Sequence, residues 1–182
     1  MGIIREHTVS LFTAAIFSAD DAAIQWGIDQ LVTLLGTVLL TSEIFLFDET
    51  KYYVKHMGEP IKKQLVLFGG TLDPSELYRV KVQTNDLEVR FKDTHKTAVE
   101  RPLNIDPGYI TPSKFILATT KDGSHRIYIK DGIYGEVTLH YRDESWNPYP
   151  WTYPDYRHGK YFDFLNRARE LLLEARSQHL SL

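Results

Sequence analysis

"SHRIYIKDGIYGEVTLHY", residues Ser124 to Tyr141, decides the predicted fold because it has the pattern of a β-hairpin. β-branched and aromatic residues fill both arms, and the Asp131-Gly132 dipeptide between them is typical of a hairpin turn. The same arms carry charged side chains, among them Arg126 and Glu136. These charges belong either to a solvated face of a sheet or to the floor of a binding site.

The length of the turn sets which residues pair across the hairpin. A two-residue turn at 131–132 would mix polar and apolar side chains on both faces, whereas a three-residue loop at 130–132 pairs Ile129 with Ile133 and separates them. We therefore predict the three-residue loop. Its apolar face carries Ile127, Ile129, Ile133, Val137, Leu139 and Tyr141. Its polar face carries Arg126, Tyr128, Tyr134, Glu136, Thr138 and His140.

The predicted register makes Arg126 a direct cross-strand neighbour of Glu136 and sets Tyr128 opposite Tyr134. An exposed ion pair of this kind contributes about 0–1 kcal/mol to stability on a solvated face. Alternatively, the arginine binds an anionic group while the glutamate orients it or transfers a proton. His125, at the entrance to the first arm, is either a general acid or base near neutral pH or a structural group.

The composition is typical of a soluble globular protein. The chain has 182 residues, of which 43% are hydrophobic and 25% charged, so it is long enough to bury a core. We predict a single globular domain over residues 1–182. A formal net charge of −3 offers no basic surface for nucleic acid, and we expect no nucleic-acid partner.

The sequence contains no cysteine, which excludes disulfides, thiolate nucleophiles and zinc–thiolate sites and is consistent with a reducing cytoplasm. The apolar stretch Gln30–Ser42 is too short to span a bilayer and is flanked by Asp29 and Glu43. The short apolar run Val9–Phe17 lacks the pattern of a secretory signal. We therefore expect a cytoplasmic protein with no membrane partner.

Strand and helix signals alternate before the hairpin. Helix starts are clearest at Asp20-Asp21 and at "DPSE", Asp73 to Glu76, which combines an N-cap carboxylate, a proline and a capping-box glutamate. Strands are predicted over residues 7–18, 38–47, 63–68 and 103–106. Helices are predicted over residues 20–35, 50–57, 73–91 and 159–178. "TPSK", Thr111 to Lys114, suggests a further N-cap, so Phe115–Thr119 fit either the start of a short helix or a strand.

This order of elements predicts an α+β fold, with a mostly antiparallel sheet and helices packed on one face. Two successive βαβ halves favour a ferredoxin-like arrangement, followed by a β-hairpin and a C-terminal helix. A connector rich in proline and tryptophan, Trp146–Pro154, joins the hairpin to that helix. The aromatic residues of Trp151–Arg157 either cover the core or form a stacking wall for a planar ligand.

Five stretches together resemble a prokaryotic family described as domain of unknown function 4416. In chain order they are FDETKYYVKHMG (Phe47–Gly58), TNDLE (Thr84–Glu88), NIDPGYITPSK (Asn104–Lys114), ATTKDGSHRIYIKDGIYGEVTL (Ala118–Leu139) and PWTYPDYR (Pro150–Arg157). The resemblance covers nearly the whole chain and implies no particular activity. These stretches contain more ionisable groups than a fold alone requires, which suggests a functional site.

Some members of that family carry a GTP-binding label, but the sequence excludes a P-loop GTPase. No G-x-x-x-x-G-K-[ST] run is present, and "TKDG" at Thr120–Gly123 is a poor match to N-K-x-D. The seven histidines show neither H-x-H nor H-x-x-x-H spacing, so no histidine-based metal centre is expected. An oxygen-ligand magnesium site would draw on Asp48, Glu88, Asp106 and Glu136, although no local motif requires it.

The first hypothesis is a site on the polar hairpin face, covered by Trp151–Arg157, for a small anionic ligand of phosphorylated or nucleotide-like type. The acid–base candidates are Glu136, His125 and Asp106. The ligand-binding candidates are Lys121, Arg126, Tyr128, Tyr134, Tyr109, Asp155 and Arg157. Structural alternatives stay open, since Asp106 also suits a turn before Pro107-Gly108 and Asp155 also suits a helix cap.

The second hypothesis is a non-enzymatic interaction module. Either the aromatic connector or the terminal helix would bind a protein partner, and the helix would also serve for association into a homo-oligomer. A pocket with converging charged groups would favour the first hypothesis, and a flat exposed aromatic patch would favour the second.

Overall fold

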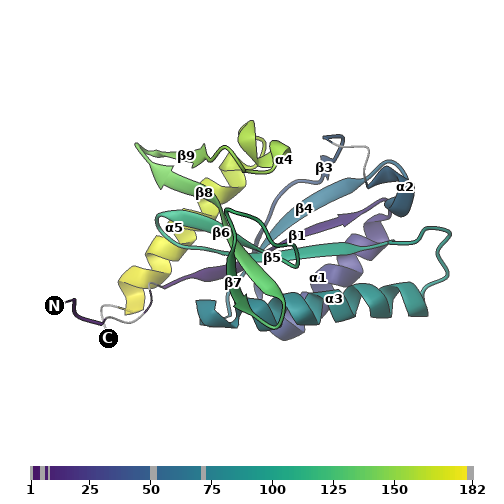
Figure 1. Cartoon of the computed structure of the whole chain (residues 1–182), viewed down its shortest axis with the longest axis horizontal. Coiled ribbons are helices and arrows are strands. Elements are labelled where there is room, and N and C mark those ends of the chain that lie inside the picture. The colour runs from purple at the N-terminus through teal and green to yellow at the C-terminus, as the bar shows by residue number, and fades with distance from the viewer. Residues whose placement is uncertain (1, 5–6, 8, 50–52, 71–72, 180–182) are drawn as a thin grey trace.

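The computed structural model describes residues 2–4, 7, 9–49, 53–70 and 73–179. The first elements are β1 (Leu11–Ser18), α1 (Asp21–Leu35), β2 (Val38–Thr41), β3 (Phe45–Leu46), α2 (Val54–Met57), β4 (Lys62–Phe68), η1 (Pro74–Glu76) and α3 (Leu77–Thr94). The remaining elements are β5 (Asn104–Ile110), β6 (Lys114–Thr119), β7 (Ile127–Lys130), β8 (Ile133–Arg142), β9 (Ser145–Pro148), α4 (Pro154–Arg157) and α5 (Phe162–His179). Figure 1 shows their arrangement.

The strands of the described residues form one antiparallel sheet in the order β2-β4-β1-β5-β6-β8-β7, with β3 paired to β4 and β9 paired to β8. Its first half, β2-β4-β1-β5, has the strand order of a ferredoxin-like unit made from β1-α1-β2 and β4-α3-β5. The α+β class and the mostly antiparallel sheet are therefore confirmed. The later strands extend this sheet beyond β5.

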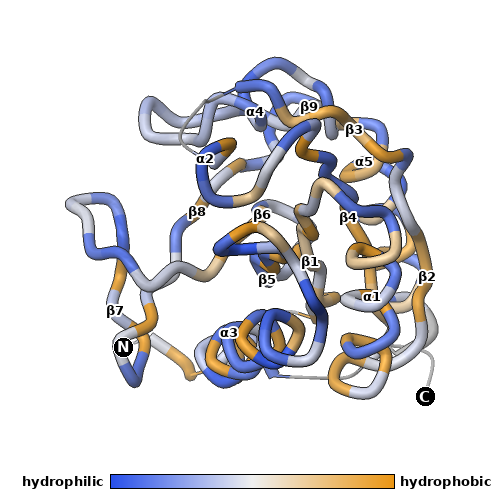
Figure 2. The backbone as a smooth tube through the Cα atoms, turned by 90° about the vertical axis from the view of Figure 1, so that its right-hand side faces the viewer, coloured by the Kyte–Doolittle hydropathy of each residue, from blue (hydrophilic) through white to orange (hydrophobic). Residues whose placement is uncertain are grey.

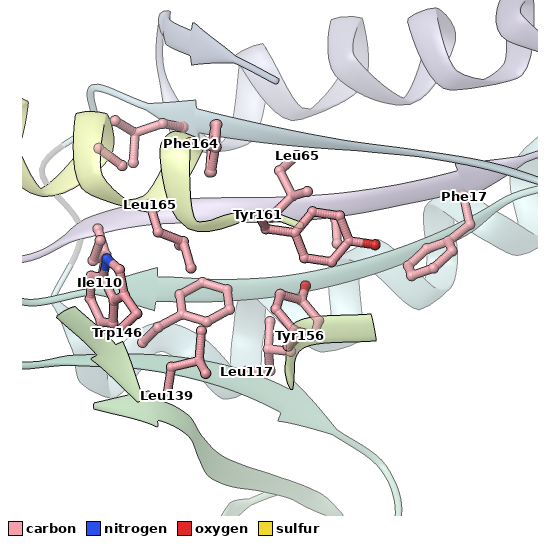
Figure 3. Packing of buried hydrophobic residues seen from close by; sticks show 14 of the residues in the cluster. Phe17, Leu65, Ile110, Leu117, Leu139, Trp146, Tyr156, Tyr161, Phe164 and Leu165 are labelled. Carbon is pink, nitrogen blue, oxygen red and sulfur yellow. The ribbon is translucent and has the colours of Figure 1, made fainter. Parts of the chain in front are cut away.

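Helices cover both faces of the sheet (Figure 2). α1 and α3 pack on one face, as predicted, in a cluster that includes Leu31, Val80 and Ile105. α5 departs from the predicted arrangement, because Leu165 and Leu172 join the core on the opposite face (Figure 3). The reason lies in β1, which is buried at every position and therefore needs apolar cover on both sides.

The hairpin of β7 and β8 has a two-residue turn. Asp131 and Gly132 both have positive φ angles, 52° and 78°, which is the requirement of a type I′ turn. Lys130 pairs with Ile133, and Ile129 forms a bulge. The predicted three-residue loop, with Ile129 opposite Ile133, is therefore wrong, because the bulge supplies the extra residue within the strand instead of in the turn.

The pairing beyond this bulge is the predicted one. Tyr128 lies opposite Tyr134, and Ile127 lies opposite Gly135. The next positions along the two arms bring Arg126 to Glu136, whose side chains are hydrogen-bonded at 3.0 Å. Hydrophobic sorting therefore identified the correct neighbours although the turn itself was wrong.

A second bulge, at Thr138, overturns the predicted division of β8 into an apolar and a polar face. The pairing with β6 skips Thr138, so Val137 and Leu139 pack on opposite faces of the sheet. Glu136 consequently shares a face with Leu139 and is only 1% exposed. Ile127, predicted to be buried, is 74% exposed. A bulge reverses the alternation of side chains, and a period-two reading of the sequence contains no sign of it.

Lys114–Thr119 form strand β6, so the helical alternative for Phe115–Thr119 is wrong. The hydroxyl of Thr111 accepts hydrogen bonds from the backbone N–H groups of Ser113 and Lys114, which closes a tight turn between β5 and β6. β5 also continues through Pro107-Gly108, which were predicted to end it. The predicted strand over 38–47 is divided into β2 and β3.

β5 and β6 diverge at one end, and this opening positions the site described below. The two strands pair only at Gly108, Tyr109 and Ile110 of β5. Before Gly108, β5 pairs with β1 alone, while β6 continues to pair with β8. Gly108 lies at the last pair, where an added Cβ would stand 2.2 Å from the carbonyl oxygen of Ile116.

We expect the Gly108→Ala variant to lower the free energy of unfolding by about 3 kcal/mol, because the backbone of β6 cannot move away without breaking its pairing. Gly132→Ala is the control, with nothing within 4 Å of the added Cβ and a left-handed φ of 78°. Its cost should be about 1 kcal/mol. Urea denaturation measures both, and equal losses would contradict the close approach of the two strands.

Candidate functional site

A cavity of about 430 Å³ lies where β5 and β6 part. Its aromatic wall consists of Phe17, Phe47, Tyr53, Tyr153 and Tyr156. Its basic side chains are Lys63, Lys81, Arg101, Lys121 and Arg126. Its acidic side chains are Glu49, Asp106 and Asp155. The lining therefore combines flat apolar surface with an excess of positive charge.

Two side chains of α3 complete the hydrogen bonding of the open edge of β5. The N–H of Ile105 donates to Oε1 of Glu88 at 2.7 Å, and its carbonyl oxygen accepts from Nζ of Lys81 at 2.9 Å. These bonds replace the ladder that β6 does not supply, since buried backbone groups need partners. Burial raises the pKa of Glu88 above its usual value, although Lys81 and Arg101 act in the opposite direction.

The Lys81 ammonium also forms an ion pair with a carboxylate of the cavity. Its Nζ lies 3.0 Å from Oδ1 of Asp106, and Nδ2 of Asn104 donates to Oδ2 of the same residue at 2.9 Å. Burial alone would raise the pKa of Asp106, but the charge of Lys81 and these two hydrogen bonds outweigh it and hold the pKa below its usual value. Asp106 is therefore an anion at neutral pH.

Arg101 is held from behind by Glu88. Its Nε and Nη2 donate to Oε2 of Glu88 at 3.3 and 2.8 Å, and Nη2 also donates to Oδ1 of Asn104. Glu88 does not line the cavity, whereas Arg101 does. Among the described residues, Nη1 of Arg101 has no hydrogen-bond partner, so this amino group is available to a ligand.

The hairpin supplies a second arginine, which is held in the same way. Nε of Arg126 donates to Oε2 of Glu136 at 3.0 Å, and Nε2 of His125 lies 3.2 Å from the same oxygen. The side chains of Arg126 and Glu136 are 11% and 1% exposed, so the interpretation of this pair as a solvated surface ion pair is wrong. Nη1 of Arg126 donates to the carbonyl oxygen of Lys121 at 3.1 Å.

Tyr153 joins the hairpin to the connector before α4. Its Oη accepts a hydrogen bond from Nη2 of Arg126 at 3.0 Å, so its own proton is left to donate elsewhere. Burial, followed by the negative charge of Glu136, raises the pKa of Tyr153 to about 12. The phenol therefore stays neutral and acts as a hydrogen-bond donor at physiological pH.

A buried ion pair contributes to the lining of the cavity. Nζ of Lys63, on β4, lies 2.5 Å from Oδ2 of Asp155, and the two side chains are 1% and 6% exposed. The ammonium stands 3.9 Å from the ring centre of Tyr156 and 4.3 Å from that of Tyr161. Burial lowers the pKa of Lys63, although Asp155 favours its charged form. Cation–π contacts and one carboxylate thus replace water around this charge.

The residues predicted for the site fall into three groups. Those that line the cavity are Asp106, Lys121, Arg126 and Asp155. Those that lie behind Arg126 are Glu136 and His125. Those that lie elsewhere are Tyr128, Tyr134, Tyr109 and Arg157. Charged residues of the hairpin and of the connector therefore converge. The cavity that they line has a second side, formed by α3 and β5, which was not predicted.

The four residues outside the cavity have local contacts of their own. Tyr128 and Tyr134 form an edge-to-face pair with ring centres 5.4 Å apart, and Tyr109 packs toward α3. Arg157 donates to the carbonyl oxygens of Thr152 and Pro150, and so it braces the connector.

Sequence reasoning missed the contribution of α3. Leu77, Lys81, Thr84, Glu88 and Phe91 recur at spacings of three and four, so they share one face of the helix. Two charged residues in such a stripe indicate ionic partners on the opposing strand, and this signal was available in the sequence. The signal for a buried role of Lys63 was weaker, because a lysine at the start of a strand usually reaches solvent.

No group of three or more His, Cys, Asp or Glu in the described ranges is placed to hold a metal ion. Three of the carboxylates considered for magnesium pair with basic groups instead: Glu88, Asp106 and Glu136. No helix in this part of the chain has the length and apolar character needed to cross a membrane.

The fold and the site together define an α+β protein with a ferredoxin-like half-sheet and a charged cavity at a strand divergence. A family model described as Domain of unknown function (DUF4416) matches residues 7–172. The chain belongs to this family, as its five characteristic stretches predicted. A search of curated proteins and a search of solved structures each returned no match.

We expect Lys63→Met to lower the free energy of unfolding by about 3–5 kcal/mol, because Asp155 would stay buried without its partner. Lys63→Met/Asp155→Asn should recover part of this loss, since both charges are then removed. Lys62→Met is the matched control, because Lys62 pairs with a carboxylate that is 61% exposed. A single Lys63 variant as stable as this control, measured by urea denaturation, would contradict the buried pair.

The depressed pKa of Asp106 predicts a pH-dependent contribution to stability. Its ionised form stabilises the folded chain above the ordinary pKa of 3.8, and this contribution is lost as the pH falls through the lower folded value. Asp106→Asn should therefore reduce the free energy of unfolding at neutral pH, and its difference from the natural chain should shrink below pH 3.8. The control is Asp86→Asn, on the exposed side of α3. A difference that stays constant across this range would argue against the assignment.

Proposed function

We propose that the cavity binds a small anionic molecule with a flat apolar part, of phosphorylated or nucleotide-like type. The observation that carries this proposal is the way in which Arg101 and Arg126 are held. Each guanidinium is fixed by a carboxylate outside the cavity, Glu88 or Glu136, and keeps N–H groups for the interior. Pre-oriented arginines bind phosphate and carboxylate groups through paired, charge-assisted hydrogen bonds.

The rest of the lining supports the same class of ligand. Phe47, Tyr53 and Tyr153 offer aromatic surface on which a planar group can stack. The neutral phenol of Tyr153 adds a donor that is already polarised by Arg126. A volume of about 430 Å³ suits a small molecule of nucleotide size.

The acid–base candidates take different roles in this proposal. Asp106 lines the cavity and, with its low pKa, serves as an acceptor that orients Lys81 and a ligand donor. Glu136 and His125 lie behind Arg126, so we assign them the positioning of that guanidinium. The proposal is therefore one of binding, and it assigns no reaction.

The interaction module has less support. Trp151, at the centre of the connector, is stacked between Tyr149 and His125 with ring centres 4.7 and 5.7 Å away. Its Nε1 also donates to the carbonyl oxygen of Val137 at 3.2 Å. The aromatic residues of the connector thus make specific contacts within their own chain, while Trp151 is 40% exposed.

A thermal-shift screen of nucleotides, sugar phosphates and carboxylates tests the proposal. A ligand that binds the folded chain should stabilise it by about 2.7 kcal/mol at one hundred times its Kd. We expect Arg126→Gln to weaken binding of the best compound by about tenfold or more, because a charge-assisted contact is lost. Arg142→Gln should leave binding unchanged, since Arg142 is 76% exposed and does not line the cavity.

Folding of the variant must be separated from binding, because Arg126→Gln leaves Glu136 buried without its main partner. Arg126→Gln/Glu136→Gln restores a neutral hydrogen-bonded pair, and it should fold normally while binding as weakly as the single variant. Unaltered binding by this double variant, or a screen without any stabilising compound, would refute the proposal.

A further inference from the structure

Four of the five basic side chains of the cavity form two groups that belong to its different sides, and the fifth, Lys63, is paired with Asp155. Arg101 and Lys81 stand beside β5 and α3, whereas Arg126 and Lys121 stand at the end of β6 and the start of β7. Since β5 and β6 diverge here, the two groups line opposite strands of the opening. Tyr153 lines the same cavity and accepts a hydrogen bond from Nη2 of Arg126 at 3.0 Å.

Each group is constructed independently of the other. Glu88, which holds Arg101, is itself fixed by the N–H of Ile105. Glu136, which holds Arg126, is 1% exposed and contacts His125. No described carboxylate bridges the two arginines, so neither guanidinium depends on the other for its orientation.

Each arginine also keeps donors for a ligand. Nη1 of Arg101 has no partner within the described residues. Each terminal nitrogen of Arg126 carries two hydrogens and makes one hydrogen bond, to Lys121 or to Tyr153. The two groups stand on opposite strands of the opening and each arginine is fixed by its own carboxylate, so each group forms a separate set of donors for an anionic group.

We infer that the ligand carries two separate anionic groups, one bound by Arg101 with Lys81 and the other by Arg126 with Lys121. This inference rests on the proposed function, and it narrows the ligand to a bis-anionic molecule. A nucleoside bisphosphate has this chemistry, with its base against the aromatic wall and its phosphates on opposite strands of the opening. A molecule with one anionic group would fill only half of the charged lining.

Isothermal titration calorimetry with four probes tests the inference on the full chain. The probes are inorganic phosphate, adenosine 5′-monophosphate, adenosine 3′-monophosphate and adenosine 3′,5′-bisphosphate. We expect the bisphosphate to bind at least about tenfold more tightly than either monophosphate, because the second contact becomes intramolecular. Inorganic phosphate should occupy two sites per chain.

The arginine variants assign each phosphate to its group. Arg101→Gln should remove the contribution of one of the two phosphates to the affinity for the bisphosphate, and Arg126→Gln should remove the contribution of the other. Each variant should retain one site for inorganic phosphate. Arg142→Gln, outside the cavity, should match the natural chain. If circular dichroism shows that Arg101→Gln does not fold, Arg101→Lys replaces it, because it keeps the charge and loses the paired N–H geometry.

The outcomes separate the two proposals. A bisphosphate that binds no better than a monophosphate, or variants that both lose the same phosphate, would overturn the two-anion inference and leave the binding proposal in place. If no probe binds the natural chain while another single anion from the thermal-shift screen does, the inference also fails and the proposed function stands. If nothing binds, both fall.

Discussion

The divergence of β5 from β6 is the constraint on which the rest of the site depends. It leaves the N–H and carbonyl of Ile105 without strand partners at a buried position, and such groups must be satisfied. Glu88 and Lys81 satisfy them from α3, which draws a carboxylate and an ammonium into the protein. Those two charges then need partners of their own, and they find them in Arg101 and Asp106. The need to satisfy the backbone groups of Ile105 thus accounts for the charged residues on the β5 and α3 side of the cavity.

The other half follows from a bulge. Because the pairing of β8 with β6 skips Thr138, Glu136 turns toward the face that α4 and α5 cover, instead of toward solvent. A carboxylate buried to 1% exposure is stable only when it is paired, and Arg126 with His125 provides the pairing. Each irregularity of the sheet therefore places one charged pair where the strands part, and regular strands would have placed neither.

Much of the fold was accessible from the sequence, and the site was accessible only in part. The hairpin neighbours Arg126 and Glu136 follow from the separation of polar and apolar residues along two strands, a local pattern. Lys81 and Glu88 share a helix face with Leu77 and Phe91, but their role depends on a strand that is distant in the sequence. Local periodicity has no information on which strand a helix packs against, so that half of the site was missed.

The sequence by itself determined the α+β class, the family, the positions of the main helices and the arms of the hairpin, because propensity, capping and alternation act over a few residues. Only the tertiary structure decided that α5 covers the second face of the sheet, that bulges at Ile129 and Thr138 redirect their strands, and that Lys63 meets Asp155 in a cage of aromatic rings. These features arise from packing between segments far apart in the chain, where burial changes the free energy of each charge.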